Sequence, residues 1–92
     1  MKKFDCIFLD RDGTLNPDPG YINNISNYNF YDFTLPALKM MAKNFHPFCI
    51  VTNQSGVARG LIPIKNLHII NDFIKKELSA NNISLLNIYM CF

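Results

Sequence analysis

The sequence lacks several features that would place it in a specialised class of protein. It has no tryptophan, and only 17% of its 92 residues are charged whereas 49% are apolar, which is too hydrophobic for a disordered chain. Its nine basic residues are scattered, with no more than two adjacent, and this argues against a nucleic-acid-binding protein. A chain of this length forms at most one small domain.

Cysteines and long apolar runs are also scarce. Cys6, Cys49 and Cys91 are widely spaced and odd in number, which argues against a disulfide scaffold and favours a reducing compartment. Asp5 and Asp10 interrupt the apolar run near the N-terminus, so this run is too short for a signal-peptide core or a membrane span of about 20 residues. We therefore expect a cytoplasmic protein.

The order of the apolar segments predicts an α/β fold. Short apolar runs at 4–9, 48–51 and 85–90 are typical of buried parallel strands. Apolar residues recur at helical spacing over 35–45 and 67–78, and the segment 16–31, rich in Asn, Pro and Gly, is expected to be a long ordered loop. This order predicts a Rossmann-like parallel sheet with right-handed crossovers, covered by helices on both faces.

Polar residues follow the first two expected strands, at the edge where ligands bind in such sheets. Asp10 and Asp12 are followed by Gly13, which permits a tight turn, and two close carboxylates repel each other unless a cation or a proton intervenes. Mg²⁺ prefers such oxygen ligands together with substrate phosphates. Asp10 could then attack phosphorus while Asp12 gives and takes a proton. The alternative is an ordinary Asp-Gly turn with a solvent-exposed acid.

The second polar segment can hold a phosphoryl oxygen. Thr52 and Asn53 provide a hydroxyl, an amide and main-chain N–H groups, although a polar strand end is often only a cap or a turn. Arg59 could clamp a second phosphate or sugar oxygens, or be an exposed loop residue. His46 and His68 have no neighbouring acid or serine in the motifs and receive no chemical role.

These motifs resemble those of a known family. The pattern Asp-x-Asp-Gly-Thr at 10–14, with Thr52 as a second motif, is similar to the haloacid-dehalogenase-like (HAD) phosphatases. Segments 8–16, 20–21 and 51–60 resemble the heptose bisphosphate phosphatases of that family more closely, and the resemblance covers the whole chain. The related histidinol-phosphate phosphatases share 10–14 and 52–54 but typically have Asp-Gly where this chain has Ser55-Gly56, and they remain the alternative.

The resemblance implies a phosphomonoester hydrolase that removes the 7-phosphate of D-glycero-D-manno-heptose 1,7-bisphosphate through an aspartyl-phosphate. Asp10 would be the nucleophile, and Asp12 would act as the acid and the base. Both would bind Mg²⁺, Asp12 through its main-chain carbonyl. Thr52 would stabilise the transferred phosphoryl group. The residues implied to contact the substrate are Asp10, Arg11, Asp12, Asp18, Pro19, Gly20, Tyr21, Thr52, Asn53, Gln54, Ser55 and Arg59.

The resemblance also implies features that this sequence does not contain. Members carry a zinc loop, and Cys91 falls where the first zinc ligand should be. Phe92 stands where members have a proline after that cysteine. Because one thiolate cannot form a four-ligand site, we expect no zinc. The third-motif Lys or Arg and the fourth-motif acids have no counterpart here. We therefore expect residues 1–92 to be the N-terminal part of a single HAD-like domain, with about three strands and two helices and with weakened Mg²⁺ binding and turnover.

Three hypotheses about the chain remain open at this stage. It can be a piece of a heptose bisphosphate phosphatase, or a phosphatase completed by another polypeptide or by dimerisation. It can also be a non-catalytic phosphosugar- or Mg²⁺-binding module or an inactive remnant. In the family a fourth strand pairs beside the first one, so without it the first strand would be an exposed edge that favours self-association or pairing with a complementing chain. No nucleic acid or membrane partner is expected.

Overall fold

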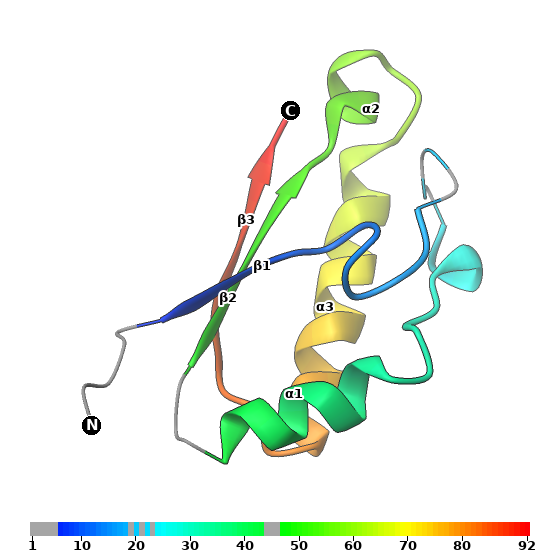
Figure 1. Ribbon diagram of the computed structural model, residues 1–92. Coiled ribbons are helices and arrows are strands. Elements are labelled where there is room, and N and C mark those ends of the chain that lie inside the picture. The colour runs from blue at the N-terminus through cyan, green and yellow to red at the C-terminus, as the bar shows by residue number, and fades with distance from the viewer. Residues whose placement is uncertain (1–5, 19, 21, 23, 44–46) are drawn as a thin grey trace.

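The computed structural model describes residues 6–18, 20, 22, 24–43 and 47–92. Strands β1 (Ile7–Asp10), β2 (Phe48–Asn53) and β3 (Leu85–Cys91) form a parallel sheet in the order β1-β2-β3. Helix α1 (Thr34–Ala42) lies between β1 and β2 in sequence, and α2 (Ser55–Ala58) and α3 (Ile64–Ala80) lie between β2 and β3 (Figure 1). A 3₁₀ turn, η1 (Ile25–Asn27), precedes α1. The predicted parallel α/β fold is confirmed.

Some element boundaries differ from the sequence-based expectation. Strand β2 continues through Thr52 and Asn53, which were expected to follow the strand, and the short helix α2 was not predicted. Helix α1 begins at Thr34 without a side-chain cap, because its N-cap residue Phe33 has no side-chain acceptor. The Thr34 hydroxyl donates to the carbonyl of Leu15 (2.7 Å). Positions 44–45, at the end of the expected helical segment 35–45, lie outside the described residues.

Helices α1 and α3 lie on the same side of the sheet, and the core is the layer between them and the strands (Figure 1). Helix α3 buries the predicted stripe of Leu67, Ile70, Ile74 and Leu78, as its 3.6-residue periodicity requires. Phe48 and Ile50 of β2 are fully buried beneath it. No helix in the described part of the chain is long and apolar enough to cross a membrane.

The expectation that both faces of the sheet are covered is wrong for the described residues. Phe8, Val51 and Tyr89, one from each strand, are 66%, 39% and 51% exposed. The register pairs Val51 with Tyr89, and period-2 alternation places Phe8 on the same face, away from α1 and α3. The first strand is therefore not buried on both sides, and it forms one edge of the sheet.

The long loop before α1 is attached to the core at several points. Ile22 and Tyr28 are buried, and the main-chain N–H of Tyr31 donates to the carbonyl of Leu15 (3.0 Å). The Tyr28 ring also packs edge-on against Phe30 and Phe73, so the loop contacts α3. The prediction of an ordered loop is confirmed for its described part, and this order brings Asp18 and Gly20 toward the carboxyl edge of the sheet.

Candidate active site

A cavity of about 260 Å³ lies at the carboxyl edge of the sheet. It is lined by Asp10, Asp12, Asp18, Gly20, Asn53, Gln54 and Ser55. Asp10 ends β1 and Asn53 ends the neighbouring parallel strand β2, so the fold brings the two polar motifs together as the sequence predicted. A larger cavity of about 620 Å³, between the end of α3 and the start of β3, contains none of the motif residues.

A tight turn after β1 sets the direction of the two carboxylates. The N–H groups of Thr14 and Leu15 donate to the carbonyl of Arg11, at 3.1 and 2.8 Å, and Gly13 donates to the carbonyl of Asn16 at 2.7 Å. Gly13 has a φ of +84°, which L-residues with a side chain rarely adopt. The turn gives Asp10 and Asp12 separate surroundings, although both line the same cavity.

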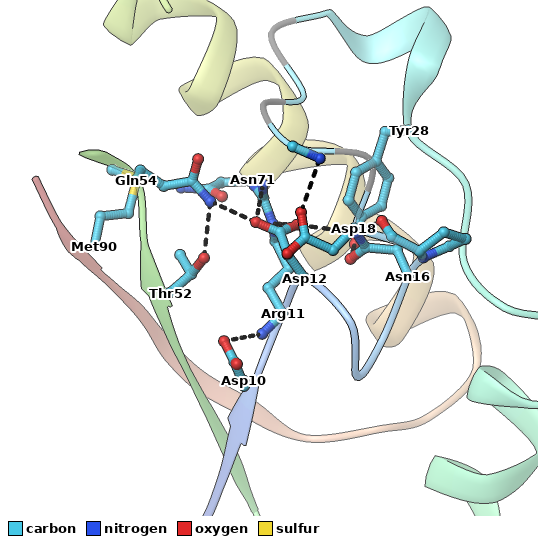
Figure 2. Close-up of polar contacts among 12 residues, drawn as sticks. Asp10, Arg11, Asp12, Asn16, Asp18, Tyr28, Thr52, Gln54, Asn71 and Met90 are labelled. Carbon is cyan, nitrogen blue, oxygen red and sulfur yellow. Dashed lines mark hydrogen bonds and ion pairs between the residues drawn. The ribbon is translucent and has the colours of Figure 1, made fainter. Parts of the chain in front are cut away.

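The carboxylate of Asp12 is held by four hydrogen bonds (Figure 2). Its Oδ1 accepts from Nε of Arg11 (2.8 Å) and Nδ2 of Asn16 (2.9 Å). Its Oδ2 accepts from Nη2 of Arg11 (2.9 Å) and Nε2 of Gln54 (3.0 Å). Two bonds on each oxygen, two of them from one bidentate guanidinium, fix the orientation of this side chain.

The side chain of Arg11 is entirely buried, and its guanidinium carbon lies 5.6 Å from the centre of the Tyr28 ring. Its Nη1 is buried without a hydrogen-bond partner among the described residues. A buried guanidinium is tolerated because Asp12 supplies an opposite charge at bonding distance. Arg11 does not line the cavity, and its predicted contact with the substrate stays a prediction.

Asn16 and Tyr28 belong to the same network, and sequence reasoning did not identify them as site residues. The Tyr28 hydroxyl donates to Oδ1 of Asn16 (2.8 Å), and Asn16 donates in turn to Asp12. Burial raises the pKa of the Tyr28 hydroxyl well above its usual value, because the phenolate would lose its hydration, and the nearby Arg11 offsets only part of this effect. The only sequence signal was that Asn16 ends the segment 8–16, which carries the resemblance around the first motif.

The second motif contributes two buried polar side chains. Thr52 and Gln54 are 1% and 2% exposed, and Nε2 of Gln54 donates to the hydroxyl oxygen of Thr52 (2.8 Å) as well as to Asp12. The main-chain N–H of Gln54 donates to the carbonyl of Cys91 (2.6 Å). Gln54 therefore connects the carboxyl ends of β2 and β3 to the turn after β1.

Of the remaining predicted site residues, some line the cavity and others do not. Asp18 and Gly20 line the cavity, and Oδ1 of Asp18 accepts from the N–H of Gly20 (3.1 Å). Pro19 and Tyr21 lie outside the described residues. Arg59 is exposed beyond α2 and does not line the cavity, and Cys91 is exposed at the end of β3. The roles predicted for all these residues stay predictions.

Asp10 and Asp12 fit a Mg²⁺ ion that completes its shell with water and phosphate. The described donors to the Asp10 carboxylate are limited to the main-chain N–H of Arg11 (2.8 Å), so Asp10 has acceptor positions left for a metal. Asp12 uses its carboxylate within the protein, which leaves its main-chain carbonyl. Within the described ranges no group of three His, Cys, Asp or Glu could hold a metal, but Mg²⁺ commonly binds through one or two carboxylates.

Replacing Tyr28 by phenylalanine tests whether this buried network is formed. Tyr28→Phe leaves Oδ1 of Asn16 without its donor in a buried position, so the free energy of unfolding should fall by about 1–3 kcal/mol. Tyr89→Phe, at a half-exposed position on β3, is the matched control and should change it by less than about 0.5 kcal/mol. Urea unfolding of both variants measures the difference, and equal effects would contradict the network.

Comparisons with known proteins agree with this geometry. No family model matches the sequence. The chain is 37% identical over 90 residues to the D-glycero-beta-D-manno-heptose-1,7-bisphosphate 7-phosphatase of Escherichia coli K12, covering 98% of the chain and 47% of that protein. The enzyme of the same name from Haemophilus influenzae is 40% identical over 86 residues, covering 94% of the chain and 47% of that protein.

Solved structures show the same relationship. The chain matches the D,D-heptose 1,7-bisphosphate phosphatase of B. bronchiseptica, complexed with magnesium and phosphate, with a TM-score of 0.86 and 29% identity over 96% of this chain and 50% of that one. It also matches a HAD-like phosphatase from Mesorhizobium loti, with a TM-score of 0.82 and 29% identity over 97% of this chain and 43% of that one. The chain therefore has the fold of the HAD-like phosphatases and is similar, over about half of their length, to the heptose bisphosphate phosphatases.

Proposed function

We propose that this chain carries the phosphoryl-transfer centre of a Mg²⁺-dependent phosphatase that releases the 7-phosphate of D-glycero-D-manno-heptose 1,7-bisphosphate. The observation that carries the proposal is the single cavity shared by Asp10, Asp12 and the segment 53–55. The names of the relatives support the substrate, and the magnesium and phosphate of the solved relative support the metal and the reaction. Because the chain spans about half of these relatives, the activity of the whole enzyme is part of the proposal.

In this proposal the two carboxylates divide the work. Asp10 is exposed at the end of β1, and its carboxylate forms a bond to phosphorus while the bond between phosphorus and the sugar oxygen breaks. Asp12 donates a proton to the departing sugar oxygen. Water then attacks the aspartyl-phosphate, Asp12 accepts the proton of that water, and phosphate leaves with Asp10 restored.

The surrounding residues hold the transferred group. Thr52 is 1% exposed and is not among the residues that line the cavity. In this proposal its hydroxyl, at the end of β2, donates to a phosphoryl oxygen, and Asn53, which lines the cavity, offers its side-chain amide. Asp10 and the main-chain carbonyl of Asp12 would hold the Mg²⁺ ion. When bound, this ion neutralises phosphate charge that would otherwise repel the carboxylate nucleophile.

Replacing the nucleophile tests the proposal. Asp10→Asn keeps the shape of the side chain but removes the carboxylate, so Mg²⁺-dependent phosphate release from heptose 1,7-bisphosphate should fall by roughly 10³-fold or more. Asp72→Asn, on the exposed face of α3, is the matched control and should retain the wild-type rate. Phosphate release is measured with and without EDTA.

Two outcomes would overturn the proposal. Equal release by the wild type and Asp10→Asn would exclude Asp10 as the nucleophile. Binding of the bisphosphate by the wild type without any release would instead show a non-catalytic phosphosugar-binding module.

We also propose that the chain self-associates through the edge of β1. Within the described residues β1 pairs with β2 alone, so its outer edge presents unpaired N–H and C=O groups beside the exposed Phe8. Phe8→Lys places a charge on this edge strand and should shift the chain toward monomer in sedimentation velocity. Phe33→Lys, at a similarly exposed position before α1, should not. A wild-type chain that stays monomeric at every concentration would contradict this.

A further inference from the structure

We infer that Gln54 is a positioning residue that links Asp12 to Thr52, and that its side chain donates no hydrogen bond to the substrate. The sequence resemblance had placed Gln54 among the residues that contact the substrate. The inference rests on the proposed function for the roles of Asp12 and Thr52, and it adds to that function a residue that fixes these two groups relative to each other.

Every hydrogen that Gln54 can donate is already used within the protein. Its Nε2 donates to Oδ2 of Asp12 (3.0 Å) and to the hydroxyl oxygen of Thr52 (2.8 Å), and its main-chain N–H donates to the carbonyl of Cys91 (2.6 Å). A glutamine has two amide hydrogens and one main-chain hydrogen, so none remains. Phosphoryl oxygens accept hydrogen bonds only, and Gln54 therefore has nothing to offer them.

The orientation of the Gln54 amide follows from its neighbour. In its ion pair with Arg11 the carboxylate of Asp12 accepts hydrogen bonds and donates none, so the amide nitrogen faces it in this state. The reversed amide would place Oε1 against Oδ2 of Asp12, two acceptors at bonding distance, in a residue that is only 2% exposed. The nitrogen is thus fixed between Asp12 and Thr52, as Figure 2 shows.

Gln54 is the described residue that connects Asp12 to another strand end. Of the four hydrogen bonds to Asp12, three come from Arg11 and Asn16, which belong to the same turn. The fourth comes from Gln54, which follows β2 and is also bonded to β3 through Cys91. Gln54 therefore sets how far the proposed acid and base lies from the hydroxyl that would hold the phosphoryl group.

The contact also leaves the Thr52 hydroxyl ready to donate. Because its oxygen accepts from Gln54, its single hydrogen points elsewhere, and no group in the described part of the chain accepts it. In the proposed function a phosphoryl oxygen is that acceptor. The N–H groups of Gln54 thus act on the ligand through Thr52 and Asp12 and donate no hydrogen bond to it.

Side-chain amide NMR on the wild-type chain tests the contacts without any need for turnover. The two Nε2 hydrogens of Gln54 should exchange slowly with solvent, Thr52→Val should shift the resonance of one, and Asp12→Asn should shift the other. The Asn53 side-chain amide, which is exposed, is the matched control and should exchange fast in all three proteins. A Gln54 amide that exchanges as fast as that of Asn53, or that neither variant shifts, would overturn the inference.

Gln54→Met, which has no donor and a similar length, separates positioning from substrate contact. If Gln54 positions Asp12 and Thr52, kcat should fall by up to about 10²-fold in this variant. KM for the bisphosphate and Kd for inorganic phosphate with Mg²⁺ should change less than about threefold. Asn53→Leu, which removes an amide that lines the cavity, should raise KM instead. A raised KM with unchanged kcat in Gln54→Met would overturn the inference. A wild type without turnover would count against the proposed phosphatase, while the NMR result would still decide the role of Gln54.

Discussion

The arrangement of the site depends on the hydrogen bonding of the Asp12 carboxylate. Arg11 is entirely buried, and its positive charge is compensated by Asp12 at 2.8 Å. The same carboxylate accepts from Asn16, which ties in the loop that contains Tyr28, and from Gln54, which ties in the ends of β2 and β3. One buried charge pair thus joins segments that are far apart in the sequence.

This network explains why two acids that are two positions apart are suited to different tasks. Asp10 is exposed and receives one main-chain hydrogen bond at its carboxylate, so it can approach a ligand or a metal. Asp12 is held on both oxygens by side chains whose own positions are fixed by burial. A nucleophile needs access and a proton-transfer group needs a fixed orientation, and the turn at Gly13 provides both in one cavity.

The sequence was sufficient to predict the parallel fold, the buried stripe of α3 and the meeting of the two motifs, because each depends on periodicity or on strand direction. It was not sufficient for the long polar side chains. Asn71, a polar residue beside the apolar stripe of α3, is only 5% exposed, with Nδ2 near the sulfur of Met90 (3.3 Å). The direction of the Gln54 side chain depends on Asp12, which is 42 positions away, and that of Arg11 on its neighbour Asp12 and on the Tyr28 ring from another segment. The covered second face was inferred from what parallel sheets usually show.

The most direct test of the Asp12 network is the free energy of unfolding of Asp12→Asn compared with that of Asp10→Asn. Asp12→Asn leaves the buried Arg11 without an opposite charge and should lower this free energy by about 3 kcal/mol. Asp10→Asn is a substitution at an exposed position, and it keeps a side-chain oxygen that can accept from the Arg11 N–H. It should alter the free energy of unfolding by less than about 0.5 kcal/mol. Equal effects of the two substitutions would contradict the account.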